Sequence, residues 1–328
     1  MTIERTAAEH EQADTGAAAP GTAARGTTAD GPADERARPG ARGRLEVHKT
    51  YKLYVNGAFP RSESGRSYEI RSAEGDFLAN AARASRKDLR DAVRAARAAF
   101  PKWSAATAYN RGQVLYRVAE MLEGRREQFI AEVAASEGTS SEHAAATVDA
   151  AVDRWVWYAG WTDKIAQVTG GTNPVAGPYF NFSLPEPSGV IGIVAPQDSA
   201  LLGLVSVVAP VIAGGNTCVV LAAQDRPLPA ITLAEVLATS DLPGGVVNLL
   251  TGHTAELAPW LAAHMDVNGL DLTGVSEPAA ADLERAAADS VKRVLRRPAT
   301  DPDWTADPGT HRLTAFLETK TVWHPIGI

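Results

Sequence analysis

The sequence predicts an α/β fold built on a doubly wound parallel sheet, and two observations support this prediction. From Val190 onward, short apolar runs typical of buried strands alternate with segments of helix length. Each run is followed by a short polar or glycine-containing loop, as expected for strand-to-helix turns. The four clearest runs are VIGIVAP, TCVVLAA, VVNLLTG and GLDLTG.

The region before Val190 is expected to begin with a hairpin and a capped helix. Apolar and polar residues alternate around Asn56-Gly57, a dipeptide typical of tight hairpin turns. Ser85 is placed to cap a helix whose third position is Asp88. Pro101 is expected to end this helix, because proline cannot donate to the helical hydrogen-bond ladder.

Three further helices follow from apolar side chains spaced three or four residues apart. One is expected from about Asn110 into the 130s, and one from about Asp149 to Ile165, where tryptophans and a tyrosine form a core stripe. The last covers PAAADLERAAADSVKRVLRR and is expected to end at Pro298. The segment RLTAFLETKTVWHP is then expected to contain a final strand.

The composition excludes several classes of protein. A net charge of −7 over 328 residues argues against a nucleic-acid-binding surface, which needs clustered Lys and Arg. One cysteine excludes an intrachain disulfide and a cysteine-based metal site, and the seven histidines are scattered. No apolar run has signal-peptide or membrane-helix length, so no membrane partner, no metal and a cytoplasmic location are expected.

The residues themselves offer little chemistry. Cys218 lies in the middle of the strand-like TCVVL run, where a thiol is expected to be buried and inert rather than nucleophilic. The loops APQDS, AAQDRP, TGHT and TGVSEP each follow a predicted strand, where a doubly wound sheet binds ligands. Composition alone leaves two interpretations open for these loops, a cofactor site or ordinary turns.

These segments together resemble the aldehyde dehydrogenase superfamily. EPSGVIGIVAP, APVIAGGNTCVVL, LPGGVVNLLTG, HMDVNGLDLTGVSE and VKRV occur in the order and spacing of that family. The resemblance runs from about Leu53 to Val294 and resumes near Leu313 to Pro325. It implies a Rossmann-like cofactor-binding domain for NAD(P). It also implies that the family's catalytic domain, which holds the cysteine nucleophile and the base glutamate, is missing after Val294.

The resemblance divides the chain into parts. Residues 1–44 are rich in Ala, Gly, Thr, Pro and Arg and are expected to form a disordered tail, with a docking arm as the alternative. Residues 45–297 are expected to form the cofactor-binding domain, with strands near 170–185 belonging to a small oligomerisation sheet. A linker over 298–312 and a C-terminal oligomerisation strand over 313–328 complete the division.

The cofactor loops depart from the family pattern. Asp198 stands where the family has its oxyanion-holding asparagine, and Gln197 replaces a tryptophan. Ala222 stands in place of a lysine that binds the cofactor's ribose, and Val275 in place of a serine. No catalytic residue is expected to be intact. The degenerate cofactor positions are Pro196, Asp198, Ala222, Asp225, Gly252, Thr273 and Gly274.

The expected function is therefore that of a non-catalytic partner or scaffold subunit. In the family, the oligomerisation sheet docks on the catalytic domain of a neighbouring subunit, so the partner expected here is a full-length aldehyde dehydrogenase. The alternatives are NAD(P)-dependent aldehyde oxidation with a cysteine supplied by the partner, or through Cys218, and cofactor binding without chemistry. A decaying gene fragment is the remaining interpretation.

Overall fold

The computed structural model describes residues 47–327, so the tail expected over 1–44 lies outside the described residues. Every described helix and strand lies between Thr50 and Pro325.

The predicted parallel sheet is present and has five strands in the order β10-β9-β6-β7-β8. Its strands are β6 (Val190–Val194), β7 (Thr217–Leu221), β8 (Val247–Leu250), β9 (Gly269–Asp271) and β10 (Arg293–Leu295). All residues of β6, β7, β8 and β9 are buried, which is why these runs are largely apolar rather than alternating, with buried polar exceptions such as Asn248 and Asp271.

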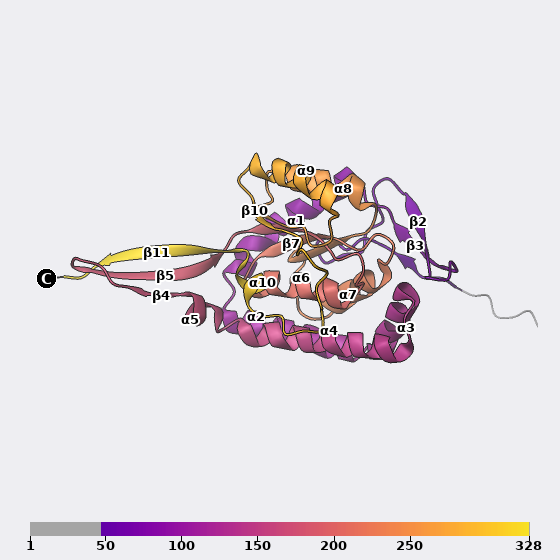
Figure 1. The fold of residues 1–328 in the computed structure, drawn as a ribbon, viewed down its shortest axis with the longest axis horizontal. Coiled ribbons are helices and arrows are strands. Elements are labelled where there is room, and N and C mark those ends of the chain that lie inside the picture. The colour runs from indigo at the N-terminus through magenta and orange to yellow at the C-terminus, as the bar shows by residue number, and fades with distance from the viewer. Residues whose placement is uncertain (1–46, 328) are drawn as a thin grey trace, which may run out of the picture. The chain divides into compact units, whose positions relative to one another are not determined.

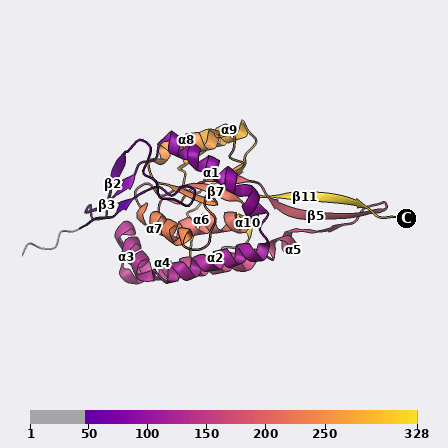
Figure 2. The ribbon, with the colours of Figure 1, turned by 180° about the vertical axis from the view of Figure 1, so that it is seen from behind.

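Helices cover both faces of this sheet, which confirms the doubly wound class (Figure 1). On one face lie α1 (Arg86–Ser104), α8 (Thr254–Ala263) and α9 (Glu277–Ala288). The other face is covered by α6 (Leu202–Ala213) and α7 (Leu228–Ala238), and outside these by α2 (Ala108–Glu123), α3 (Arg126–Glu137) and α4 (Ser141–Trp161). Figure 2 shows the same layers from behind.

The expected hairpin is wrong in extent. Asn56 and Gly57 do form a tight turn with positive φ, but the pairing it closes is a single bridge between Val55 and Ala58. Tyr54 pairs with Leu249 of β8 instead, because the chain joins the larger sheet here. The surrounding strands β1 (Thr50–Tyr51), β2 (Ser67–Arg71) and β3 (Phe77–Ala82) form a separate sheet in the order β1-β3-β2.

Four expected helices are also wrong in their limits. The helix expected from about Asp149 to Ile165 is α4, which begins at Ser141 and ends at Trp161. Pro101 lies inside α1, whose last turn is held by the buried Trp103, which donates its indole N–H to Ile212 O (3.0 Å). The helix expected from Asn110 into the 130s breaks at Gly124 into α2 and α3. The last helix ends at Ala288, and Arg293–Leu295 pairs with β9 as β10. The N-terminal cap of α1 is confirmed, with a capping box between Ser85 and Asp88.

The third sheet joins distant segments. Strands β4 (Gly171–Asn173), β5 (Tyr179–Pro187) and β11 (Leu317–Pro325) are antiparallel in the order β11-β5-β4, and a short helix α5 (Ile165–Thr169) precedes them. Between β10 and β11 the chain crosses the body as a strap, residues 296–316, which contains the single-turn α10 (His311–Thr314). No helix within residues 47–327 has the length and apolarity needed to span a membrane.

Candidate functional site

The loops that follow the parallel strands form the candidate site. Because β6, β7, β8 and β9 run in the same direction, their following loops meet at one end of the sheet. This topology brings together all of the positions proposed from the sequence: Pro196, Asp198, Ala222, Asp225, Gly252, Thr273 and Gly274.

Two glutamines connect three of these loops. Gln197, after β6, donates to Ala195 O (2.7 Å) and accepts a hydrogen bond from the backbone N–H of Gln224, after β7 (2.9 Å). The Gln224 side-chain oxygen accepts in turn from the N–H of Thr254 at the start of α8 (3.3 Å), and the Gln224 backbone carbonyl accepts from the Tyr68 hydroxyl (3.0 Å). The loops are therefore fixed by the protein's own polar groups.

The degenerate positions lie in different environments. Asp198 is exposed, and its backbone carbonyl accepts a hydrogen bond from Arg226 Nη1 (2.8 Å). Asp225 is also exposed, whereas Pro196 and Ala222 are buried. An ionised carboxylate at Asp198 would repel a developing oxyanion rather than stabilise it.

The glycines of the site permit close approaches of the backbone. A side chain at Gly274 would place its Cβ 1.8 Å from Ala195 O, so only glycine lets the β9 loop cross the β6 loop. Gly252 has φ +142°, and a Cβ there would lie 3.1 Å from Ala84 N. Val275 is buried and offers no donor to a phosphate.

A buried ion pair at the end of β9 was not expected from the sequence. Asp271 is 1% exposed, and its Oδ2 lies 2.8 Å from Nη1 of Arg312 in the strap. Thr273 donates its hydroxyl hydrogen to Asp271 Oδ1 (2.5 Å) and accepts a hydrogen bond from Arg312 Nη2 (2.9 Å). The signal in the sequence was an aspartate inside the apolar run GLDLTG, which demands a compensating charge.

A groove of about 460 Å³ lies beside these loops, between α8 and α9. Its lining includes Gln197, Gln224, Asp225, Val275 and Asp282, and the charged residues among its lining are both aspartates. NAD(P) carries a pyrophosphate, which is bound where cations or helix N–H groups face it. The starts of α8 and α9, at Thr254 and Ser276, line the groove, but its charged side chains are both aspartates, which oppose the binding of a dinucleotide.

The candidate nucleophile lies elsewhere. Cys218 is in β7, between Ile191 of β6 and Val247 of β8, and is fully buried. Burial raises the pKa of its thiol far above the usual value, which disfavours the thiolate that nucleophilic attack requires. Within residues 47–327, no group of His, Cys, Asp and Glu side chains is placed to hold a metal ion.

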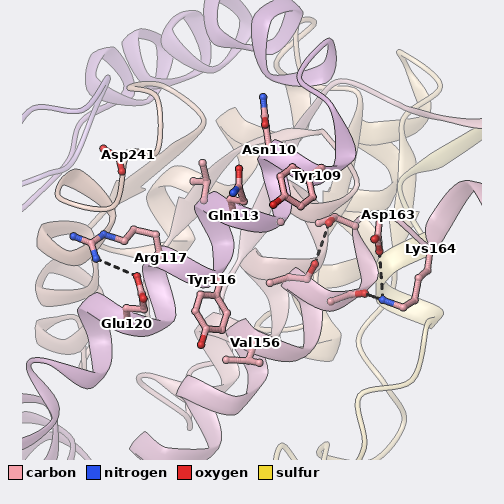
Figure 3. Close-up of a pocket in the computed structure, with 15 residues that line it drawn as sticks. Tyr109, Asn110, Gln113, Tyr116, Arg117, Glu120, Val156, Asp163, Lys164 and Asp241 are labelled. Carbon is pink, nitrogen blue, oxygen red and sulfur yellow. Dashed lines mark hydrogen bonds and ion pairs between the residues drawn. The ribbon is translucent and has the colours of Figure 1, made fainter.

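A second groove, about 850 Å³, lies on the outer face of α2 and the end of α4 (Figure 3). Tyr109, Tyr116 and Val156 supply exposed apolar surface along it. Its charged residues largely pair with one another, Arg117 with Glu120 (3.0 Å) and Lys164 with Asp163 (3.3 Å). It shares no residue with the loops at the carboxyl end of the sheet.

Comparison with known proteins decides the family. The sequence matches the aldehyde dehydrogenase family over residues 59–296. The chain belongs to the aldehyde dehydrogenase family. It is 31% identical over 263 residues to "Aldehyde dehydrogenase, cytosolic 1" of Elephantulus edwardii, covering 78% of this chain and 51% of that protein. It is 32% identical to human "Retinal dehydrogenase 2" over 262 residues, covering 78% and 50%.

Solved structures agree with this membership. The NAD⁺ complex of aldehyde dehydrogenase from Bacillus cereus aligns with a TM-score of 0.72 at 30% identity, covering 75% of this chain and 50% of that one. HpcC from Thermus thermophilus gives 0.71 at 32%, covering 75% and 47%. This aldehyde dehydrogenase family chain thus spans about half the length of the relatives it matches.

Proposed function

We propose that this chain is a non-catalytic subunit that assembles with a full-length aldehyde dehydrogenase through the sheet β4-β5-β11. The observation that carries the proposal is an apolar sheet face without a covering layer in the described residues. Phe180, Phe182 and Leu184 alternate along β5 on this face, and Val322 stands opposite Phe182 on β11. Phe180 is 47% and Leu184 42% exposed, although both are apolar.

The opposite face of the same sheet has a polar centre, and an exposed aromatic pair, Tyr179 and Trp323, lies at its end. Asn173 donates to Asn181 Oδ1 (2.6 Å) and to Ser183 Oγ (2.9 Å), and Ser183 shares a hydrogen bond with Thr321 (2.9 Å). The centres of the two faces therefore differ in chemistry, as in sheets that bury one side. Asn181 Nδ2 on the polar side is buried and has no acceptor within residues 47–327. This asymmetry supports docking through the Phe180 face.

The free edge of β11 offers a second means of attachment. Among residues 47–327 no strand pairs with β11 on the side away from β5. A nine-residue edge strand is a ready template for strand addition from another protein. Family membership makes an aldehyde dehydrogenase subunit the partner we propose, and a shared cytoplasmic location follows from that proposal.

The non-catalytic part of the proposal rests on two residues. Cys218 is the chain's one cysteine and lies inside the sheet, and Asp198 puts a carboxylate where the family resemblance implies an oxyanion-binding asparagine. NAD(P) binding is not part of the proposed function, because the groove beside the loops carries only negative charges.

Co-expression with a full-length aldehyde dehydrogenase from the same genome tests the proposal. We expect the two chains to co-purify at a fixed ratio. Phe180→Ser with Leu184→Ser should abolish this by placing hydroxyls in the interface. Val168→Ser is the matched control, because Val168 is 60% exposed and lies in α5, outside the sheet.

Two results would contradict the proposal. Recovery of the chain without any dehydrogenase subunit would reject the partner, provided that circular dichroism shows a folded chain. Aldehyde-dependent NAD(P)H formation above that of the partner alone would reject the non-catalytic role and favour the alternative of assisted aldehyde oxidation.

A further inference from the structure

Two adjoining cavities lie where β3 leads into α1, on the side of α8 that faces α1. The smaller is about 160 Å³ and the larger about 530 Å³. Ser85, Arg86 and Trp260 line both cavities, so only these side chains need lie between them. Neither contains a residue of β4, β5 or β11, or any of the positions proposed from the sequence for cofactor binding.

The smaller cavity carries excess positive charge in an acidic protein. Arg66, Arg83 and Arg86, here called the arginine cluster, face it together with one carboxylate, Glu256. Glu256 forms an ion pair with Arg83. Arg66 and Arg86 have no carboxylate partner anywhere in the described part of the chain, whose full sequence has a net charge of −7.

The cluster also holds unused hydrogen-bond donors. The Nε of Arg83 is buried, and within residues 47–327 it has no acceptor. A buried donor without an acceptor is costly, so the site is more stable with an acceptor present. Arg86 stacks on the Trp260 ring, 3.7 Å from the ring centre to the guanidinium carbon, which leaves the N–H groups in its plane available.

The larger cavity supplies a different surface. Leu89, Ala263 and the Trp260 ring give it an apolar wall. The charged residues at its margin are paired, Lys87 with Glu63 (3.4 Å) and Arg90 with Asp91 (3.1 Å). A ligand that spans both cavities would therefore place an anionic group at the arginine cluster and an apolar group against the tryptophan.

We propose that the arginine cluster binds a small phosphate monoester, with the phosphate in the smaller cavity and its organic part in the larger one. Two arginines without carboxylate partners match the two charges of a monoester, and guanidinium forks match its three terminal oxygens. A carboxylate or a sulfate ester carries one negative charge and would leave one of the two arginine charges without a counter-charge. The site lies apart from the sheet that carries the proposed function, so either proposal can fail alone.

Isothermal titration of the full chain at pH 8 tests this inference, with phenyl phosphate, inorganic phosphate and phenyl sulfate as probes. We expect one saturable site for phenyl phosphate, weaker binding of inorganic phosphate, and at least about tenfold weaker binding of phenyl sulfate. Arg66→Gln and Arg86→Gln should each weaken phenyl phosphate binding about tenfold by removing a charge-assisted contact. Both side chains are exposed, so unfolding temperatures should be unchanged.

Arg94→Gln is the matched control. It removes the same charge from an exposed position of α1 that lines neither cavity. Equal weakening by this variant would show only general electrostatic attraction and overturn the assignment. Absence of saturable binding at 10 mM phenyl phosphate, or equal affinity for phenyl sulfate, would overturn it too.

Discussion

Arg312 Nη1 lies 2.8 Å from Asp271 Oδ2, which joins the strap to the buried end of β9 across 41 residues of sequence. The strap is held at a second point, where Arg154 of α4 donates to the carbonyls of Trp304 (2.6 Å) and Ala306 (3.0 Å). The segment expected as a linker over 298–312 is thus bound to the body by two arginines. The buried carboxylate of Asp271 in the central sheet is thus neutralised by the guanidinium of Arg312 in the strap.

Replacing one member of this pair should be strongly destabilising. Arg312→Met leaves Asp271 as a buried charge without its partner, at a cost of about 3–5 kcal/mol in the free energy of unfolding. Urea unfolding followed by circular dichroism measures the loss. Adding Asp271→Leu to Arg312→Met should recover most of it, since no buried charge is left.

An exposed ion pair of the same region provides the control. Arg296 pairs with Glu284 at 2.9 Å, but its side chain is 77% exposed. Arg296→Met should therefore change the unfolding free energy by less than about 1 kcal/mol. A similar loss of unfolding free energy in both variants would show that burial of the Asp271–Arg312 pair does not increase its contribution to stability.

Cys218 should be unreactive in the folded chain. It is fully buried, and burial raises the pKa of its thiol, so neither access nor thiolate is available. We expect no release of thionitrobenzoate from Ellman's reagent at pH 8 in buffer, and one equivalent in 6 M guanidinium chloride. Rapid labelling without denaturant would contradict the buried position and reopen a nucleophilic role.

NAD(P) should leave the stability of the chain unchanged. If the acidic groove holds the dissociation constant above about 10 mM, 1 mM cofactor stabilises the folded state by less than about 0.1 kcal/mol. Thermal unfolding with and without 1 mM NAD⁺ or NADP⁺ should then coincide, while a full-length relative shifts in the same assay. A shift of several degrees in this chain would contradict the charge argument.

Glu132 should make the folded state sensitive to pH. Its Oε1 accepts hydrogen bonds from Thr232 (2.9 Å) and Tyr51 (3.0 Å), but its Oε2 is buried and has no donor within residues 47–327. Burial raises the pKa of this carboxyl above its ordinary value. Stabilisation from the protonated acid is therefore complete below the unfolded-state pKa and is lost as the pH rises through the folded-state pKa.

The substitution Glu132→Gln mimics the protonated acid and tests this. The variant should be more stable than the parent at pH 7, with the difference vanishing toward pH 4. Glu127→Gln is the control on the same helix, because the Glu127 side chain is 87% exposed. A Glu132→Gln variant that is less stable at pH 7 would show that the carboxylate, not the acid, is the favoured form.

The parallel sheet could be predicted because its signal is local. Burial on both faces forces continuous apolar runs such as TCVVL, and the Ser85 cap lies next to the helix it begins. Pairing of β11 with β5 followed from the family resemblance rather than from spacing. The break at Gly124 was missed, because apolar spacing continues through it while the backbone does not.

The ion pairs and cavities could not be predicted in the same way. The sequence shows Asp271 as a charged residue in an apolar run, but no neighbouring residue in the sequence indicates that Arg312 is its partner. In the arginine cluster, Arg66 precedes β2 and Arg86 follows β3, and the Trp260 ring beside them belongs to α8. Such contacts depend on how the helices pack on the sheet, and the spacing of residues along the sequence does not determine this packing.

The ladder between β5 and β11 has a consequence for synthesis. Lys320 and Glu186 form an ion pair across this ladder at a separation of 134 residues. At about 5–20 residues per second, a ribosome needs about 7–27 s to make the intervening chain. During that interval β5 has no β11 to pair with, so a nascent chain cannot present the finished docking sheet. Interrupted translation would then yield products that lack the sheet on which the proposed complex depends.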